Sequence, residues 1–212
     1  MIRLSFFLFV LLFISACCDE VILTEEPDTS AAIYSPLAIG NYWIYQESIE
    51  QVDGSFQPKS TLDSVYIEKD TVVDGNRFFI IEGNRFAGPG NRYDLRRDSM
   101  GYLVDNNNNI YYSPKDNDGI LNTKVNYMPD GQFLFSVSNL MQPVDSLSLP
   151  AGDFETRVLI GSIAVNEDRL PNCGIDNETH YAKEVGIVKD QVYYSVSCSI
   201  VKIELLRYNV NK

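Results

Sequence analysis

The chain has 212 residues, of which 45% are hydrophobic and 22% charged, so it has enough apolar side chain for a packed domain and is not wholly disordered. Its 29 acidic and 17 basic residues give a net charge of −12. A surface of that charge repels phosphate backbones, which excludes nucleic acid as an expected partner. The chain has one histidine, His180, so the commonest general base and metal ligand is scarce.

The first sixteen residues, MIRLSFFLFVLLFISA, predict a signal peptide. A basic residue at Arg3 precedes an apolar run from Leu4 to Ile14, and two small residues, Ser15 and Ala16, end the segment. The apolar run is shorter than the roughly 20 residues that a membrane-spanning helix needs, so residues 1–16 are expected to be removed from the mature protein.

The sequence Ile14–Ser15–Ala16–Cys17 resembles the lipobox of bacterial lipoproteins. The resemblance implies that cleavage leaves Cys17 as the N-terminus, with diacylglycerol on its thiol and a further acyl chain such as palmitate on its amine. Three acyl chains exceed the two signals needed for stable anchoring, so the bilayer is an expected partner. An ordinary secretory signal with an incidental cysteine, or modification of Cys18 instead, are the alternatives.

Residues 17–35 predict an acidic, flexible tether, because they show neither hydrophobic period and contain five acids and no basic residue. The acidic run resembles the export signals that send lipoproteins of Bacteroidota to the cell surface, although a merely solvated linker explains the charges equally well. The expected location is therefore the outer membrane, with the lipid-anchored protein on the periplasmic face or on the cell surface.

Residues 36–212 predict a single all-β domain without metal or cofactor. Short β-branched and aromatic runs alternate with turn residues, including a hairpin signal at Asp74-Gly75 and a turn at Asp98-Ser99, and capped helical periods are lacking. We expect an antiparallel meander that forms a sandwich or an open half-barrel with little helix. The expected strands include 42–49, 64–69, 77–82, 92–97, 101–105, 110–113 and 153–158, with 199–210 as a long strand at the centre.

Three motifs together resemble a group of secreted β-rich lipoproteins that are frequent in Bacteroidota. They are Pro36–Tyr45 (PLAIGNYWIY), Pro150–Thr156 (PAGDFET) and Tyr181–Lys189 (YAKEVGIVK). The resemblance implies a β-rich fold but no established activity and no catalytic residues. Within the motifs Trp43 and Phe154 offer large areas for burial, and their glycines stand where strands begin or end.

Asp153 and Glu155 are the candidate catalytic pair, because two carboxylates on one face of a strand can act as acid and base on a glycoside. Arg157 is expected on the same face, where it would pair with Glu155. A solvated strand face explains this pattern better, so we expect no catalytic residues and no enzymatic activity.

Cys173 and Cys198 are the two cysteines of the domain. Outside the cytoplasm such a pair usually forms a disulfide, which is the expected state here. A nucleophile formed by Cys173 and His180, or two separately buried thiols, are the alternatives.

The sequence favours a non-catalytic envelope lipoprotein that binds or scaffolds a glycan or an envelope protein. A second hypothesis is a periplasmic half-barrel that handles lipids or lipoproteins and holds acyl chains on its concave face. A glycan-active enzyme based on Asp153 and Glu155 is the third. A large apolar cavity would favour the second hypothesis, whereas a sheet packed shut with side chains would exclude it.

Overall fold

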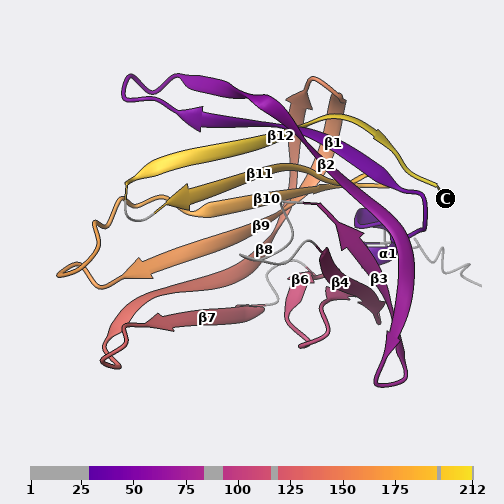
Figure 1. The fold of residues 1–212 in the computed structure, drawn as a ribbon, viewed down its shortest axis with the longest axis horizontal. Coiled ribbons are helices and arrows are strands. Elements are labelled where there is room, and N and C mark those ends of the chain that lie inside the picture. The colour runs from indigo at the N-terminus through magenta and orange to yellow at the C-terminus, as the bar shows by residue number, and fades with distance from the viewer. Residues whose placement is uncertain (1–28, 84–92, 116–118, 195–196, 212) are drawn as a thin grey trace, which may run out of the picture.

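The computed structural model describes residues 29–83, 93–115, 119–194 and 197–211. These residues form twelve strands and one four-residue helix (Figure 1). The elements are α1 (Ala31–Tyr34), β1 (Tyr42–Glu50), β2 (Phe56–Val73), β3 (Asn76–Glu82), β4 (Tyr93–Ser99), β5 (Tyr102–Val104), β6 (Ile110–Tyr112), β7 (Asn122–Tyr127), β8 (Phe133–Leu149), β9 (Gly152–Val165), β10 (Asn177–Ala182), β11 (Gly186–Tyr194) and β12 (Ser199–Asn209). No helix among the described residues is long and apolar enough to cross a membrane.

All twelve strands belong to one antiparallel sheet in the order β6-β5-β4-β3-β2-β1-β12-β11-β10-β9-β8-β7. The chain starts in the middle of the sheet, runs to one edge at β6, crosses to the other edge at β7 and returns to the middle. The last strand therefore pairs with both β1 and β11, which confirms its predicted central position. The all-β antiparallel prediction is confirmed, in its barrel-like form.

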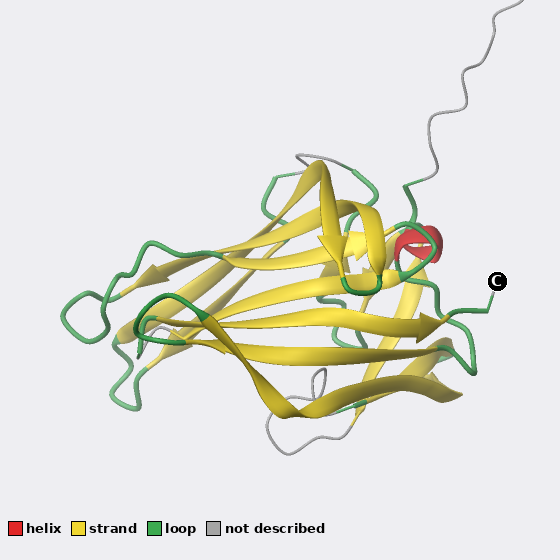
Figure 2. Cartoon of the chain, turned by 90° about the horizontal axis from the view of Figure 1, so that it is seen from above, coloured by secondary structure: helices red, strands yellow, loops and turns green. Residues whose placement is uncertain are grey.

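The sheet curls until its two edges nearly meet (Figure 2). At the first residues of β7 and β6, Asn122 Nδ2 donates a hydrogen bond of 2.6 Å to the Ile110 carbonyl. Nearby, the Tyr181 hydroxyl on β10 donates to the Tyr111 carbonyl on β6 at 2.9 Å. Such closure protects edge strands that would otherwise present unpaired backbone groups.

Residues that adopt positive φ values determine where the hairpin turns lie. The β2–β3 turn lies at Asp74-Gly75 as predicted, and both residues have positive φ values of 50° and 77°. The turn predicted at Asp98-Ser99 is wrong, because β4 continues through Ser99 and the chain reverses at Met100-Gly101, with φ values of 54° and 86°. A two-residue hairpin of this type needs positive φ at both positions, which Gly101 adopts without strain.

Residues 29–35, predicted as part of the tether, belong to the folded domain. Ala31 and Tyr34 are buried, and the Tyr34 ring stacks on Tyr112 of β6 with centroids 5.5 Å apart. The backbone N–H of Ala31 donates to the Gly101 carbonyl at 2.7 Å. The predicted tether is thus too long at this end, because a helix of four residues, Ala31–Tyr34, is too short to show a hydrophobic period.

Arg157 contradicts the predicted strand face. It was expected on a solvated face beside Glu155, but it is only 1% exposed, and its Nη1 donates to the Tyr112 hydroxyl at 2.8 Å. Its guanidinium also lies over the rings of Tyr34 and Tyr112, with Cζ 5.8 and 5.3 Å from their centroids. The β8 bulge between Gln142 and Asp145 changes the register beside this strand. The alternation of polar and apolar side chains along a strand does not tell which part of the sheet is buried by other segments of the chain.

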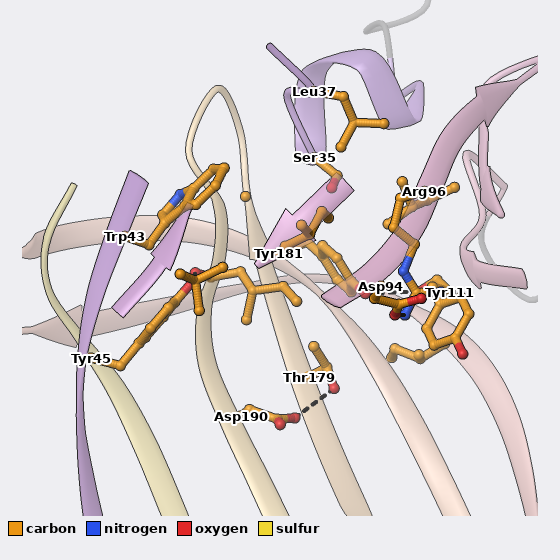
Figure 3. A pocket seen from close by; sticks show the side chains of 16 residues that line it. Ser35, Leu37, Trp43, Tyr45, Asp94, Arg96, Tyr111, Thr179, Tyr181 and Asp190 are labelled. Atoms are coloured by element: carbon orange, nitrogen blue, oxygen red, sulfur yellow. Dashed lines mark hydrogen bonds and ion pairs between the residues drawn. The ribbon is translucent and has the colours of Figure 1, made fainter. Parts of the chain in front are cut away.

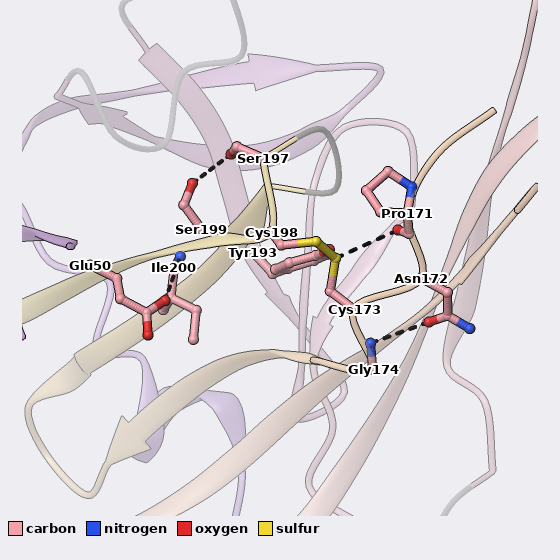
Figure 4. The surroundings of a disulfide bond; sticks show 10 residues. All are labelled: Glu50, Pro171, Asn172, Cys173, Gly174, Tyr193, Ser197, Cys198, Ser199 and Ile200. Carbon is pink, nitrogen blue, oxygen red and sulfur yellow. Dashed lines mark hydrogen bonds between the residues drawn. A yellow bond between two sulfur atoms is a disulfide. The ribbon is translucent and has the colours of Figure 1, made fainter. Parts of the chain in front are cut away.

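Cys173 and Cys198 are joined by a disulfide, with their Cα atoms 5.8 Å apart (Figure 4). The bond links the loop before β10 to the residue preceding β12. The Tyr193 hydroxyl lies 3.4 Å from the Cys198 sulfur. The bond therefore closes a loop between segments 25 residues apart in the sequence.

We expect both thiols to resist alkylation until a reductant is added, because each sulfur is already bonded. Replacing both cysteines with serine should lower the free energy of unfolding by about 3.5 kcal/mol in the chain-entropy model. Alkylation followed by mass spectrometry, with denatured but unreduced protein, measures the first effect. Two alkylated cysteines in the unreduced protein would contradict the bond.

Candidate functional site

The concave side of the curled sheet encloses a cavity of about 380 Å³ (Figure 3). Most of its wall is apolar and comes from strands that are far apart in the chain. The apolar lining includes Trp43 and Tyr45 from β1, Val65 from β2, Ile81 from β3, Leu159 from β9 and Ile187 from β11. Leu37, which follows α1, also lines the cavity. A concave, largely apolar space of this size is typical of binding sites for small molecules.

Two aromatic side chains of the wall are held in place by hydrogen bonds to β11 and the turn before it. Trp43 Nε1 donates to the Val185 carbonyl at 2.6 Å, and the Tyr45 hydroxyl donates to the Ile187 carbonyl at 2.8 Å. Gly186 lies between these two acceptors, with φ +101°, and a Cβ on it would meet the Trp43 ring at 3.5 Å. The glycine is needed for the backbone conformation, because a Cβ at 3.5 Å would make only an ordinary contact with the indole.

The polar end of the cavity is formed mainly by alternate residues of β4. Asp94 and Arg96 point to the same side, and Arg96 Nη2 forms an ion pair with Asp94. The Arg96 guanidinium also lies over the ring of Tyr111, with its Cζ 3.0 Å from the ring centroid. Burial raises the pKa of the Asp94 carboxyl, and the Arg96 charge opposes that rise.

One atom of this pair stays without a protein partner. The Arg96 side chain is only 6% exposed, and its buried Nη1 makes no hydrogen bond to the residues that the structure describes. Nearly all buried donors in folded proteins are hydrogen-bonded, so Arg96 Nη1 is an exception to that rule.

Two further polar groups complete the lining. The Thr179 hydroxyl on β10 donates to Asp190 Oδ1 on β11 at 2.7 Å. Tyr181 is fully buried, and burial raises the pKa of its hydroxyl, so it remains protonated and donates to the Tyr111 carbonyl. Among the described residues no three His, Cys, Asp or Glu side chains come together as a metal site.

The candidate catalytic pair lies elsewhere. Asp153 and Glu155 are exposed on β9 and do not line the cavity, and Asp153 accepts a hydrogen bond of 2.6 Å from Ser148. The predicted lipidation residue, Cys17, lies outside the described residues. Of the residues singled out in the sequence for burial, Trp43 lines the cavity.

Sequence reasoning missed the polar end of the cavity. The strand YDLRRDS places Asp94 and Arg96 two residues apart, which is the spacing of side chains on one face. That spacing was a usable signal for the pair, but it resembles the charged face of any solvated strand. Nothing in the sequence indicated that Tyr111, Thr179 and Asp190 would join them.

His180 lies on β10, is buried and does not line the cavity. Its Nδ1 lies 3.2 Å from the Thr156 hydroxyl and its Nε2 3.3 Å from a Glu178 carboxylate oxygen. Burial lowers the pKa of the imidazole, while the hydrogen bond to Glu178 opposes that change.

We expect this histidine to destabilise the fold as the pH falls. The folded pKa lies below the value in the unfolded chain, so below about pH 6.5 the unfolded state binds the proton first and the free energy of unfolding decreases until the folded pKa is passed. Urea unfolding at about pH 7.5 and pH 5.5 measures the change. The His180→Gln variant should lose less stability over this interval than the wild type, and equal losses would contradict the assignment.

No family model matches the sequence, and no curated protein matches it. A protein from Bacteroides fragilis, named as a candidate exported protein with a YmcC-like fold, is 12% identical and has a TM-score of 0.50, and the match covers 84% of this chain and 99% of that one. A candidate lipoprotein from Parabacteroides distasonis has the same identity and TM-score, with 84% and 98% covered. The hypothetical lipoprotein YmcC from Escherichia coli is 8% identical with a TM-score of 0.39, covering 81% and 86%. At 12% identity the first two likenesses show a shared fold.

Proposed function

We propose that the protein is a lipid-anchored envelope lipoprotein that binds a small amphipathic molecule in its cavity without chemical change. The observation that carries this proposal is the cavity of about 380 Å³ with an apolar wall and one polar end. A sheet packed shut with side chains would have left only the outer surface for binding. The cavity therefore supports the lipid-handling hypothesis over a purely scaffolding role.

The size of the cavity limits the ligand. One water molecule takes up about 30 Å³, so the space corresponds to roughly a dozen atoms of similar size. That volume suits a single short hydrocarbon chain with a polar group and is too small for a whole phospholipid with two chains. A molecule bound there would bury most of its surface, as small ligands do in preformed sites.

An envelope location has separate support. The leader ends in the lipobox-like sequence before Cys17, and two proteins of similar fold are named as a candidate exported protein and a candidate lipoprotein. Both observations favour a protein that leaves the cytoplasm and is held at a membrane, and they are independent of the cavity.

Trp43 provides a direct measurement of ligand binding, because it is the single tryptophan of the chain and lines the cavity. Titration with a medium-chain amphiphile should change the intensity or the emission maximum of its fluorescence and should saturate. A Val65→Phe variant, which fills part of the cavity, should bind at least tenfold more weakly. Val72→Phe adds the same group at an exposed position of the same strand and should bind normally.

Saturable binding that is unaffected by Val65→Phe would place the ligand outside the cavity. A complete absence of saturable binding to any single-chain amphiphile would count against the proposed function. The enzymatic alternative is tested separately with Asp153→Ala and Glu155→Ala. Turnover of a glycoside that either substitution abolishes would overturn the non-catalytic role.

Lipidation at Cys17 is expected to direct the protein to the membrane. Cells fed a clickable fatty acid should label the wild-type protein, while Cys17→Ala should lose the label and leave the membrane fraction, because no thiol remains at the cleavage site. Cys18→Ala is the matched control and should retain the label. Full labelling of Cys17→Ala would refute the assignment.

A further inference from the structure

The sheet carries a line of tyrosines that do not line the cavity. In the strand register Tyr42 on β1 pairs with Tyr66 on β2, which pairs with Glu82 on β3. Glu82 in turn pairs with Tyr93 on β4. Side chains of directly paired residues lie on the same face of a sheet. The four side chains therefore form one line across four neighbouring strands, called here the tyrosine row (Figure 1).

The tyrosine row faces away from the cavity. One chain neighbour of each member lines the cavity, namely Trp43, Val65, Ile81 and Asp94. Successive side chains of a strand point to opposite faces, so the members themselves lie on the outer side of the curled sheet. Their exposure agrees with this placement, because Tyr42, Tyr66 and Tyr93 are 40%, 41% and 55% exposed.

The spacing of the three rings suits an extended ligand. Neighbouring strands lie about 4.8 Å apart, so the backbones of Tyr42 and Tyr66 are separated by about that distance and Tyr93 lies about 10 Å beyond Tyr66. A tyrosine offers an apolar ring face together with a polar hydroxyl. Sugar rings have the matching form, with C–H groups on their faces and hydroxyls around their edges. Rings in a line can therefore stack on successive units of one glycan chain.

The polar groups of the row suit the hydroxyls of such a chain. The Tyr66 hydroxyl donates to Glu82 Oε2 at 2.8 Å, which holds the carboxylate beside the ring. On the other side of the row Asn209 of β12 pairs with Tyr42 and is exposed. Carboxylate and amide oxygens accept hydrogen bonds from hydroxyl groups, and each can accept more than one. The row thus combines stacking surfaces with acceptors at its edges.

The charges favour an uncharged ligand. Glu82 is the one ionised member of the row, and the exposed Glu68 and Lys69 nearby on β2 offset each other. Arg207, two residues from Asn209 on β12, offsets Glu82. The chain as a whole carries −12, so an acidic polymer is repelled at long range. A protein partner fits less well, because charged residues are depleted from the centres of protein interfaces and Glu82 lies between two of the tyrosines.

We propose that the outer face of the sheet binds a neutral glycan chain along the tyrosine row. The rings of Tyr42, Tyr66 and Tyr93 stack on sugar rings, and Glu82 and Asn209 accept hydrogen bonds from sugar hydroxyls. The site is separate from the cavity. The inference therefore goes beyond the proposed function and does not depend on it.

Native electrophoresis through gels that contain a dissolved polysaccharide tests the site. The protein is the mature chain from residue 17 onward with Cys17→Ser, which needs no detergent because it carries no acyl chain. The probes are the neutral polymers laminarin, mannan and xyloglucan and the acidic polymer alginate. At least one neutral polymer should retard the protein increasingly as its concentration rises, whereas alginate should not.

Single substitutions locate the binding surface. Tyr42→Ala, Tyr66→Ala and Tyr93→Ala should each weaken binding of the retarding polymer about tenfold, as expected for aromatic residues at the centre of a binding surface. Tyr66→Phe keeps the ring and loses only the hydroxyl, so it should bind nearly as well as the wild type. The matched controls Tyr127→Ala and Tyr194→Ala remove equally exposed tyrosines from β7 and β11 and should bind normally. Circular dichroism checks that each variant is folded.

Three results would overturn the inference. One is the absence of retardation by all three neutral polymers, and another is retardation by alginate that is equally strong. The third is a loss of binding in the control variants as large as that in the row variants. Dimers that the wild type forms and Tyr66→Ala loses, without retardation by any polymer, would instead assign the row to contact between protein chains. None of these results bears on the cavity, which the fluorescence of Trp43 reports separately.

Discussion

Replacing Trp43 with alanine is expected to lower the free energy of unfolding by about 3 to 5 kcal/mol, the usual range for removing a buried large aromatic side chain. The ring belongs to the buried cluster that also contains Tyr45, Val65 and Leu205. Its removal would also leave the Val185 carbonyl without the 2.6 Å hydrogen bond from Nε1. For a domain of this size the loss corresponds to a decrease in the melting temperature of roughly 6 to 20 °C.

Two further variants separate packing from hydrogen bonding at this position. Trp43→Phe keeps much of the buried area but removes the N–H, so it should cost less than Trp43→Ala. Tyr42→Ala, at the neighbouring exposed position of β1, should change the free energy of unfolding by much less. Urea unfolding followed by circular dichroism measures all three. A loss below about 1 kcal/mol for Trp43→Ala would show that the ring is not part of the core.

Replacing Arg157 with alanine is expected to cost about 3 kcal/mol, because three kinds of interaction disappear together. The variant loses the hydrogen bond to the Tyr112 hydroxyl, the contacts with the Tyr34 and Tyr112 rings, and the volume of a fully buried side chain. Arg157 Nη1 also lies 3.4 Å from the Thr29 carbonyl. The segment that carries α1 should therefore loosen more than the rest of the domain.

Hydrogen exchange of residues 29–35, measured together with global unfolding, checks this expectation. Exchange of this segment should rise in Arg157→Ala by more than global destabilisation predicts. Arg207→Ala removes an exposed arginine and should leave both measurements nearly unchanged. Uniform exchange across the domain in Arg157→Ala would show that the arginine does not hold the segment in place.

Local patterns in the sequence were enough to predict most of the fold class. Alternating apolar residues, turn residues such as Asp74-Gly75 and the lack of capped helical periods were enough to predict an antiparallel sheet with little helix. The terminal run from residue 199 was long and apolar enough to predict its central position. These features depend on neighbouring residues, so the sequence by itself determined them.

Which face of each strand is covered was decided by tertiary structure. Arg157 and Glu155 are two residues apart on β9, which is the spacing of side chains on one face of a strand. Arg157 is nevertheless buried, whereas Glu155 is exposed. Residues 29–35 looked like a tether because their apolar side chains are buried only by residues of several strands that are distant in the sequence, among them Leu103, Tyr112 and Tyr181. A charged strand face has the same pattern whether it borders water or a closed interior.

The cavity also exists only in three dimensions. Its lining comes from most of the sheet: Arg96 on β4 meets Tyr111 on β6, and the Tyr181 hydroxyl on β10 reaches the Tyr111 carbonyl. The spacing of residues within a single strand does not predict these contacts between strands. The sequence determined which residues alternate and where the chain turns, whereas the curl of the sheet decided which alternating residues face one another, because curvature brings together side chains that no local period connects.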